Sequence, residues 1–94
     1  MKSILQSEKV CFITGYTDCL EEHHCFGGNG IRKLSEKYGL KVWLRWDIHK
    51  RVTEPKNDDD LQLRQELWDF AREKFEEKYP DLDFIKVFGR SYRK

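Results

Sequence analysis

The 94-residue sequence has no run of about 18 apolar residues, the shortest length that suits a membrane-spanning helix. Its start, MKSILQSEKV, lacks both the apolar centre and the small-residue cleavage site of a signal peptide. Cysteine is scarce as well: Cys11, Cys19 and Cys25 are an odd number at spacings that fit no disulfide framework, and there is no C-x-x-C pair. We therefore expect an intracellular chain without membrane association, whose thiols stay reduced.

Apolar residues make up only 38% of the chain, and charged residues make up 37%. Three Trp, four Tyr and six Phe offset this shortage, because each aromatic side chain buries a large apolar area. The sequence contains no internal repeat, no low-complexity tract and no linker long enough to divide it. A chain of this length forms one domain, so we expect a single α+β domain over residues 1–94 with a small aromatic core.

The net charge of +1 conceals blocks of opposite sign. Residues 31–52 carry seven basic and two acidic side chains, which gives +5, whereas residues 53–82 carry five basic and ten acidic ones, which gives −5. Residues 83–94 return to +3. The pattern predicts one basic and one acidic face. A basic face suits phosphate backbones, but the balanced total argues against a strong non-specific nucleic-acid binder.

The first half of the chain predicts two strands on either side of a short helix. CLEEHHCF (19–26) is a short strand that leads into a loop at GGNG (27–30), where glycines permit backbone angles that other residues avoid. IRKLSEKY (31–38) has apolar residues at helical spacing, with Gly39 as a stop. LKVWLRW (40–46) alternates with a period of two, which is the strongest strand signal in the sequence.

The second half predicts helices. Asp47 is placed to cap a short helix over 48–54 that Pro55 closes. A long helix over 57–79 begins with acidic residues, as the positive end of the helix dipole favours, and a short final helix lies within 81–92. The apolar face of the long helix comprises Leu63, Leu67, Phe70, Ala71, Phe75 and Tyr79.

Two of the three histidines, His23 and His24, are adjacent. Neighbouring strand residues point to opposite faces, so one interpretation is a half-buried histidine beside a surface one, without a chemical role. The order of the elements favours another, because a strand ends in the pair and a second strand leads into a helix that carries His49. Two strands and a helix that gather polar side chains are typical of a ββα-metal site, where one residue binds a divalent ion and its neighbour activates water.

Four stretches carry a resemblance to a known family: KSILQSEKVCFITG, EEHHCFGGNGIRKLSEKYGLKVWL, AREKFEEKY and FIKVFGRSY. Together they resemble the small phage-type HNH endonucleases, whose core has the ββα-metal arrangement. The similarity covers nearly the whole chain, and the part around the histidine pair is the most distinctive. The resemblance implies an HNH-like ββα-metal core with a two-stranded antiparallel hairpin, a long C-terminal helix and a short final helix.

The family implies a metal-dependent DNA endonuclease that hydrolyses phosphodiester bonds with Mg²⁺ or a similar divalent ion. It also implies a phage or prophage origin and action on DNA in the bacterial cytoplasm, with a homodimer as an open alternative. By this resemblance His24 is the general base, since imidazole titrates near neutral pH. The other implied roles are metal ligation by His23, His49 and Asn57 or Asp58, and phosphate contacts by Arg32, Lys33 and Lys37.

The chain departs from the family at a structural zinc that many members hold with C-x-x-C and C-x-x-H. The matching positions here are Cys11, Thr14, Arg45 and Ile48, so only one ligand of the four is present. A closed tetrahedral site needs all four. We expect no structural zinc, with Cys11 as a core residue and with Trp46 and Ile48 packed in the place of the ion.

The last metal ligand is altered too, because Thr53, Asn57 or Asp58 stands where the family has a further histidine. The side-chain oxygen of Asn or Asp suits a hard divalent ion better than a Thr hydroxyl does. Cys25, which follows the histidine pair, is expected to be a small buried residue and not a nucleophile.

These departures keep a second function open. The chain could be a catalytically inactive binding protein on the HNH scaffold, for example an inhibitor of a host nucleic-acid-binding defence protein. In that case the acidic segment 53–82 would mimic DNA, or the basic segment 31–52 would hold DNA.

Overall fold

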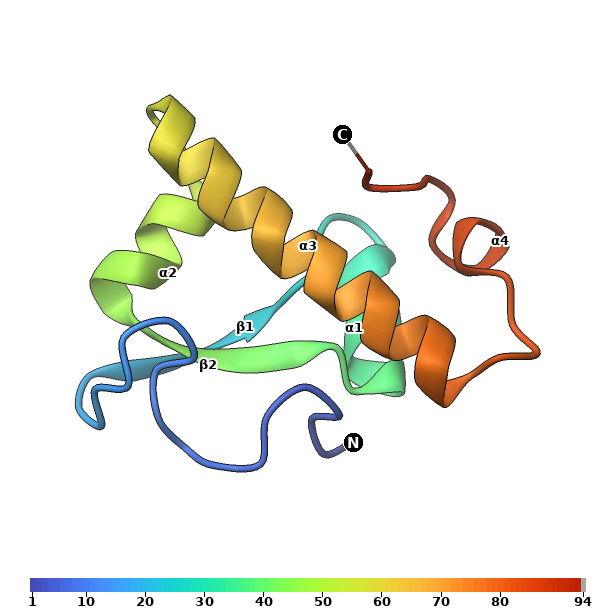
Figure 1. The fold of residues 1–94 in the computed structure, drawn as a ribbon, viewed down its shortest axis with the longest axis horizontal. Helices are drawn as coiled ribbons and strands as arrows, with labels where there is room; N and C mark the ends of the chain where they lie inside the picture. The colour runs from blue at the N-terminus through green and yellow to red at the C-terminus, as the bar shows by residue number, and fades with distance from the viewer. Residues whose placement is uncertain (94) are drawn as a thin grey trace.

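A computed structural model describes residues 1–93 of the chain. In this part of the chain, two strands and four helices surround one core, and the longest helix lies across the others (Figure 1). This confirms the predicted α+β class with an antiparallel pair of strands and a long helix. The elements are β1 (Leu20–His24), α1 (Ile31–Tyr38), β2 (Lys41–Arg45), α2 (Trp46–Thr53), α3 (Asp58–Lys78) and α4 (Phe84–Phe88).

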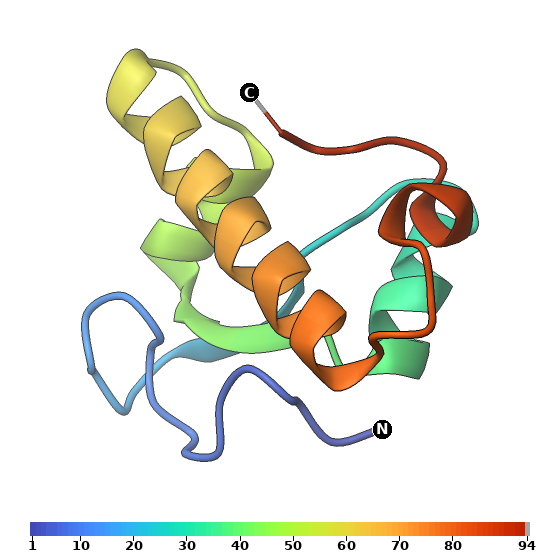
Figure 2. The same ribbon diagram turned by 45° about the vertical axis from the view of Figure 1, so that its right-hand side comes forward.

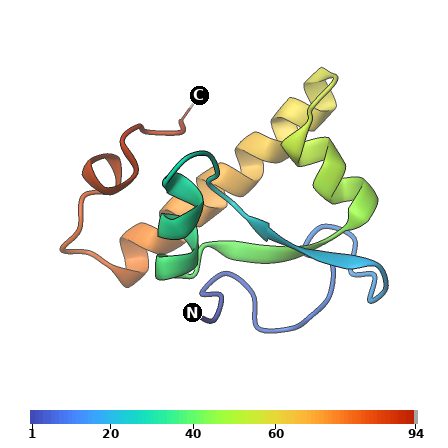
Figure 3. The ribbon, with the colours of Figure 1, turned by 180° about the vertical axis from the view of Figure 1, so that it is seen from behind.

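The strands β1 and β2 pair antiparallel although α1 lies between them in the chain. Seen from behind, β1 runs into the loop before α1, and β2 returns alongside it (Figure 3). The register places His23 opposite Val42 and His24 opposite Lys41. Because α2 begins directly after β2, the pair and α2 form a compact strand–strand–helix unit.

Glycine ends α1 where the sequence predicts. Gly39 has a φ of 72°, and its backbone N–H and that of Leu40 donate hydrogen bonds to carbonyls in the last turn of α1. A Cβ atom at Gly39 would lie 2.6 Å from the backbone oxygen of Lys2, closer than any real contact. Gly39 is therefore required both for its left-handed conformation and for the approach of the N-terminal segment.

The core forms where α3 crosses the strands and α4. Leu67, Ala71 and Phe75 of the predicted apolar face are buried, at spacings of four residues that place them on one side of α3. Although α3 has 21 residues, no helix in residues 1–93 is long and apolar enough to cross a membrane. An aromatic cluster fills the space beside this face and consists of Phe26, Phe75, Phe84, Phe88 and Tyr92.

A serine in the core ties the end of β1 to α1. Ser35 is fully buried, and its hydroxyl donates to the carbonyl of Phe26 at 2.7 Å and accepts from the N–H of Phe26 at 3.1 Å. Both backbone groups would otherwise be buried without partners, which costs free energy. This contact fixes the loop that follows the histidine pair.

Two sequence predictions about α2 are wrong. The helix begins at Trp46, so Asp47 lies in its first turn and Arg45 occupies the N-cap position. Trp46 is 53% exposed, although we expected it to pack in the core. The two-residue alternation that buries Val42 and Leu44 stops where the helix starts, and Trp46 then turns outward.

The cysteines lie as the sequence predicts. Cys11 and Cys25 are almost fully buried, and so is Ile48. Burial raises the pKa of the Cys25 thiol to about 12, so the thiol is protonated at neutral pH. Cys25 is therefore a small core residue and is unsuited to act as a nucleophile.

Candidate active site

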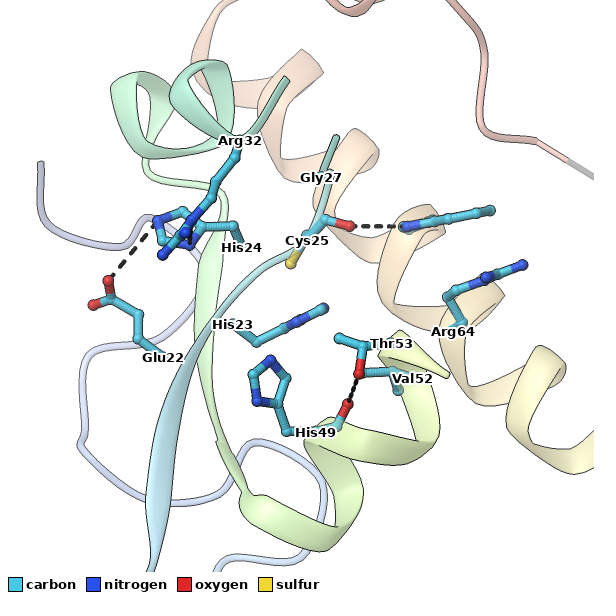
Figure 4. Close-up of a pocket in the computed structure, with 11 residues that line it drawn as sticks. Glu22, His23, His24, Cys25, Gly27, Arg32, His49, Val52, Thr53 and Arg64 are labelled. Atoms are coloured by element: carbon cyan, nitrogen blue, oxygen red, sulfur yellow. Dashed lines mark hydrogen bonds and ion pairs between the residues drawn. The ribbon is translucent and has the colours of Figure 1, made fainter. Parts of the chain in front are cut away.

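All three histidines line one open pocket with a volume of about 470 Å³. The walls come from the strand–strand–helix unit on one side and from α1 and α3 on the others (Figure 4). A pocket that gathers titratable and cationic side chains from several elements is the usual place for chemistry. The polar residues that line it include His23, His24, Arg32, His49, Thr53 and Arg64.

The histidine pair points in two directions. Because side chains alternate along β1, Glu21 and His23 share one face of the strand, and Glu22 and His24 share the other. Figure 4 shows His23 directed toward His49 on α2, whereas His24 points away from them. The two neighbours can thus have separate roles at the same pocket.

His23 and His49 form an edge-to-face pair with ring centroids 5.1 Å apart. The pKa of His23 falls to about 4, mainly because the side chain is buried and to a smaller extent because His49 and His24 lie nearby. His23 is therefore neutral at physiological pH, with a lone pair available to a ligand. On His49, Nδ1 lies 2.7 Å from a carboxylate oxygen of Glu21. If Nδ1 carries the proton, this contact leaves the lone pair on Nε2, which is the arrangement seen in metal-binding histidines.

His24 lies among charged groups on the other face of β1. Its Nε2 is 3.6 Å from a carboxylate oxygen of Glu36 and 3.8 Å from one of Glu22. Its Nδ1 accepts a hydrogen bond of 3.4 Å from Nε of Arg32. Glu22, His24 and Glu36 offer ligand atoms that all lie within 4.8 Å of one another, so these residues form a group that could hold a metal ion.

A lysine already neutralises the carboxylates of this group. Nζ of Lys41 lies 2.6 Å from one oxygen of Glu36 and 3.6 Å from one of Glu22. The hydrogen bond from Lys41 is the main reason why the pKa of Glu36 falls to about 2. A cation bound by Glu22, His24 and Glu36 would meet the ammonium group of Lys41 at close range, and this repulsion weakens the group as a metal site.

Of the eight residues that the resemblance places in the site, His23, His24, His49 and Arg32 line the pocket. Lys33 and Lys37 are exposed on α1, outside the pocket lining. Asn57 and Asp58 also lie outside it, at the start of α3. There Asn57 caps the helix, because its side-chain oxygen accepts the N–H of Asp60 at 2.8 Å.

Sequence reasoning missed Glu22, Glu36, Lys41 and Arg64. A signal for Glu36 was available, because it lies four residues after Arg32 and therefore on the same face of the predicted helix. No comparable local signal exists for Lys41 or Arg64, which reach the site through strand register and helix packing.

The buried His23 makes the free energy of unfolding depend on pH. Its pKa is about 4 in the folded chain and near the ordinary 6.5 in the unfolded chain, so only the unfolded chain binds this proton between those values. The stabilising contribution is present above pH 6.5 and is lost as the pH falls toward 4, and it amounts to about 3 kcal/mol. In urea titrations with EDTA, the wild type should lose that much more stability than His23→Gln over this range.

The comparison between the two proteins removes the effect of carboxylates, which titrate in both. Equal losses of stability for wild type and His23→Gln would show that the pKa of His23 is not lowered in the folded chain.

Comparison of the chain with protein-family models, curated proteins and solved structures found no match in any of the three. The case for a function therefore depends on the residues of the pocket and their geometry.

Proposed function

We propose that this protein is a metal-dependent DNA endonuclease of the HNH type, which hydrolyses phosphodiester bonds with His24 as the general base. The observation that carries the proposal is the pocket in which the strand–strand–helix unit gathers His23, His24 and His49. Such a unit can place a base and an electrophile on opposite sides of one phosphate. The basic Arg32 at the rim of the pocket suits the same anionic substrate.

The contacts of His24 indicate which nitrogen would act as the base. The carboxylates of Glu36 and Glu22 face Nε2, and they favour the tautomer that is protonated there. The lone pair is then on Nδ1, which accepts the hydrogen bond from Arg32. When a phosphate draws Arg32 away, Nδ1 is free to take a proton from water. The water oxygen forms a bond to phosphorus, the bond to the sugar oxygen breaks, and solvent supplies a proton to the leaving oxygen.

His23 and His49 are the residues that would hold the divalent ion, with Glu21 orienting His49. The neutral imidazole of His23 fits such an ion, which would stabilise negative charge on the phosphate and the leaving oxygen. Two imidazoles suit Ni²⁺ or another transition ion better than Mg²⁺. Thr53 lines the pocket, but its hydroxyl donates to the carbonyl of His49 at 2.9 Å and is a weak ligand.

A relaxation assay on supercoiled plasmid tests the proposal. We expect wild-type protein to nick or cut the plasmid with Ni²⁺, Mn²⁺ or Mg²⁺ and to do nothing in EDTA. Absence of cleavage with all three ions, by protein whose circular dichroism shows the expected helix content, would reject the proposal.

The second candidate is a non-catalytic binding protein on the same scaffold, such as an inhibitor of a host nucleic-acid-binding protein. Two observations favour it: Lys41 neutralises the carboxylates beside His24, and Asn57 is used as a helix cap outside the pocket. Binding of DNA or of a host protein without any cleavage, unaffected by His23→Ala and His24→Ala, would support this candidate.

A further inference from the structure

The arginines of this protein divide into two groups. Four of the seven form ion pairs with carboxylates, whereas Arg32, Arg64 and Arg90 form none with any carboxylate of residues 1–93. The paired arginines are spread over the molecule and are Arg45 with Asp47, Arg51 with Asp60, and Arg72 and Arg93 with Glu76. Of the unpaired ones, Arg32 and Arg64 line the pocket, and Arg90 lies over Trp68, which also lines it.

Two of the unpaired arginines lie over the same tryptophan. The guanidinium carbon of Arg64 is 4.6 Å from the centre of the Trp68 ring, and that of Arg90 is 5.8 Å from it. Arg90 also lies 4.4 Å from the ring of Tyr92. Arg64 and Trp68 both line the pocket of the histidines, and Arg32 lines it from α1. In Figure 4, Arg32 and Arg64 lie on opposite sides of the histidines.

Trp68 is held in place by a hydrogen bond and by aromatic packing. Its Nε1 donates a hydrogen bond of 2.9 Å to the carbonyl of Cys25, the residue that follows the histidine pair. The rings of Trp68 and Tyr92 pack edge to face at 5.0 Å, and the side chain of Gln65 donates to the carbonyl of Tyr92 at 2.8 Å. These contacts connect the C-terminal segment to α3. Figure 2 shows this segment returning from α4 toward the N-terminal half of α3. The ring over which both arginines lie is thus held by contacts of its own.

We infer that Arg64 and Arg90, which lie over Trp68, bind successive phosphates of a DNA strand that crosses the pocket, with Arg32 holding the strand on the opposite side. The inference deepens the proposed function and rests on it for the identity of the polyanion. Stacking on an aromatic ring leaves the N–H edges of a guanidinium free to bind phosphate in a bidentate manner. Because the ring beneath these side chains is held by its own contacts, phosphate binding does not have to order Trp68.

Fluorescence anisotropy with a labelled DNA duplex, in EDTA, tests this inference without cleavage. We expect Arg64→Gln and Arg90→Gln each to weaken binding roughly 10-fold and to reduce the slope of log K against log salt by about 0.9. Arg64→Lys should keep the slope, because it keeps the charge. Arg93→Gln is the matched control, since Arg93 is an exposed arginine paired with Glu76 further along α3, and its affinity should equal that of wild type.

Three outcomes would overturn the inference: no DNA binding by wild type, equal affinity of wild type and both Gln variants, or equally tight binding of poly-glutamate, which would point to an acidic protein. If wild type cleaves plasmid while Arg64→Gln keeps full affinity, only the inference fails. If wild type binds DNA through Arg64 and Arg90 but does not cleave plasmid with any of the three ions, only the endonuclease proposal fails.

Thermal melts establish whether each variant is folded. Arg90 lies outside the helices, so Arg90→Gln still tests the inference if Arg64→Gln does not fold.

Discussion

His24→Ala is expected to reduce the rate of plasmid cleavage by about 10²–10⁴-fold, the usual contribution of a general base. The two nitrogens of the His24 imidazole face different partners: Nδ1 faces Arg32, and Nε2 faces the carboxylates of Glu22 and Glu36. Alanine removes the proton acceptor and leaves the three charged side chains in place. The measurement is the initial rate of loss of supercoiled plasmid at saturating metal.

A loss of packing must be separated from a loss of chemistry, because the His24 side chain is only 9% exposed. Added imidazole should restore part of the activity of His24→Ala if the residue acts as a base, and it should do nothing if the residue only fills space. A melting temperature near that of wild type is required of the variant. Full cleavage by folded His24→Ala would remove His24 from the mechanism.

The sequence predicts the elements well wherever local periodicity decides the conformation. Helix α1 occupies 31–38 and ends at Gly39 as predicted, and β2 and α3 differ from their predicted bounds by one residue at each end. These segments combine a clear period with capping or stop residues, so local preference and packing agree. The failure at Trp46 occurred at a junction, where the alternation of β2 continued in the sequence while the backbone had already become helical.

The surroundings of the histidines were less predictable, because they depend on long-range pairing. Lys41 meets the carboxylate beside His24 because the register sets His24 opposite Lys41, and no spacing along the chain gives that register. Arg90 lies over Trp68 because the chain after α4 returns to α3, where Gln65 donates to the carbonyl of Tyr92. The histidines themselves could be identified as a candidate site, but the charges around them could not.

Phe75→Ala is expected to lower the free energy of unfolding by about 3–5 kcal/mol, the usual cost of truncating a buried phenylalanine. Phe75 is fully buried at the centre of the aromatic cluster, and its ring centroid lies 5.3 Å from that of Tyr38, 5.5 Å from that of Phe84 and 5.6 Å from that of Phe88. Alanine therefore removes contacts that join α3 to α1 and α4 at once. Domains of this size have only about 5–15 kcal/mol in total, so the variant should be close to unfolding at 37 °C.

Leu61→Ala provides the matched control on the same helix, because Leu61 is 45% exposed and should lose no more than about 0.5 kcal/mol. Urea unfolding followed by circular dichroism measures both variants. Phe84, which packs on Phe75, also packs on Tyr92, and Arg90 lies over the Tyr92 ring. Phe75→Ala should therefore displace Arg90 and weaken DNA binding as well as lower the free energy of unfolding. A loss of stability below about 1 kcal/mol for Phe75→Ala would contradict the packing of α3 on this cluster, since truncating a fully buried aromatic side chain costs more free energy than that.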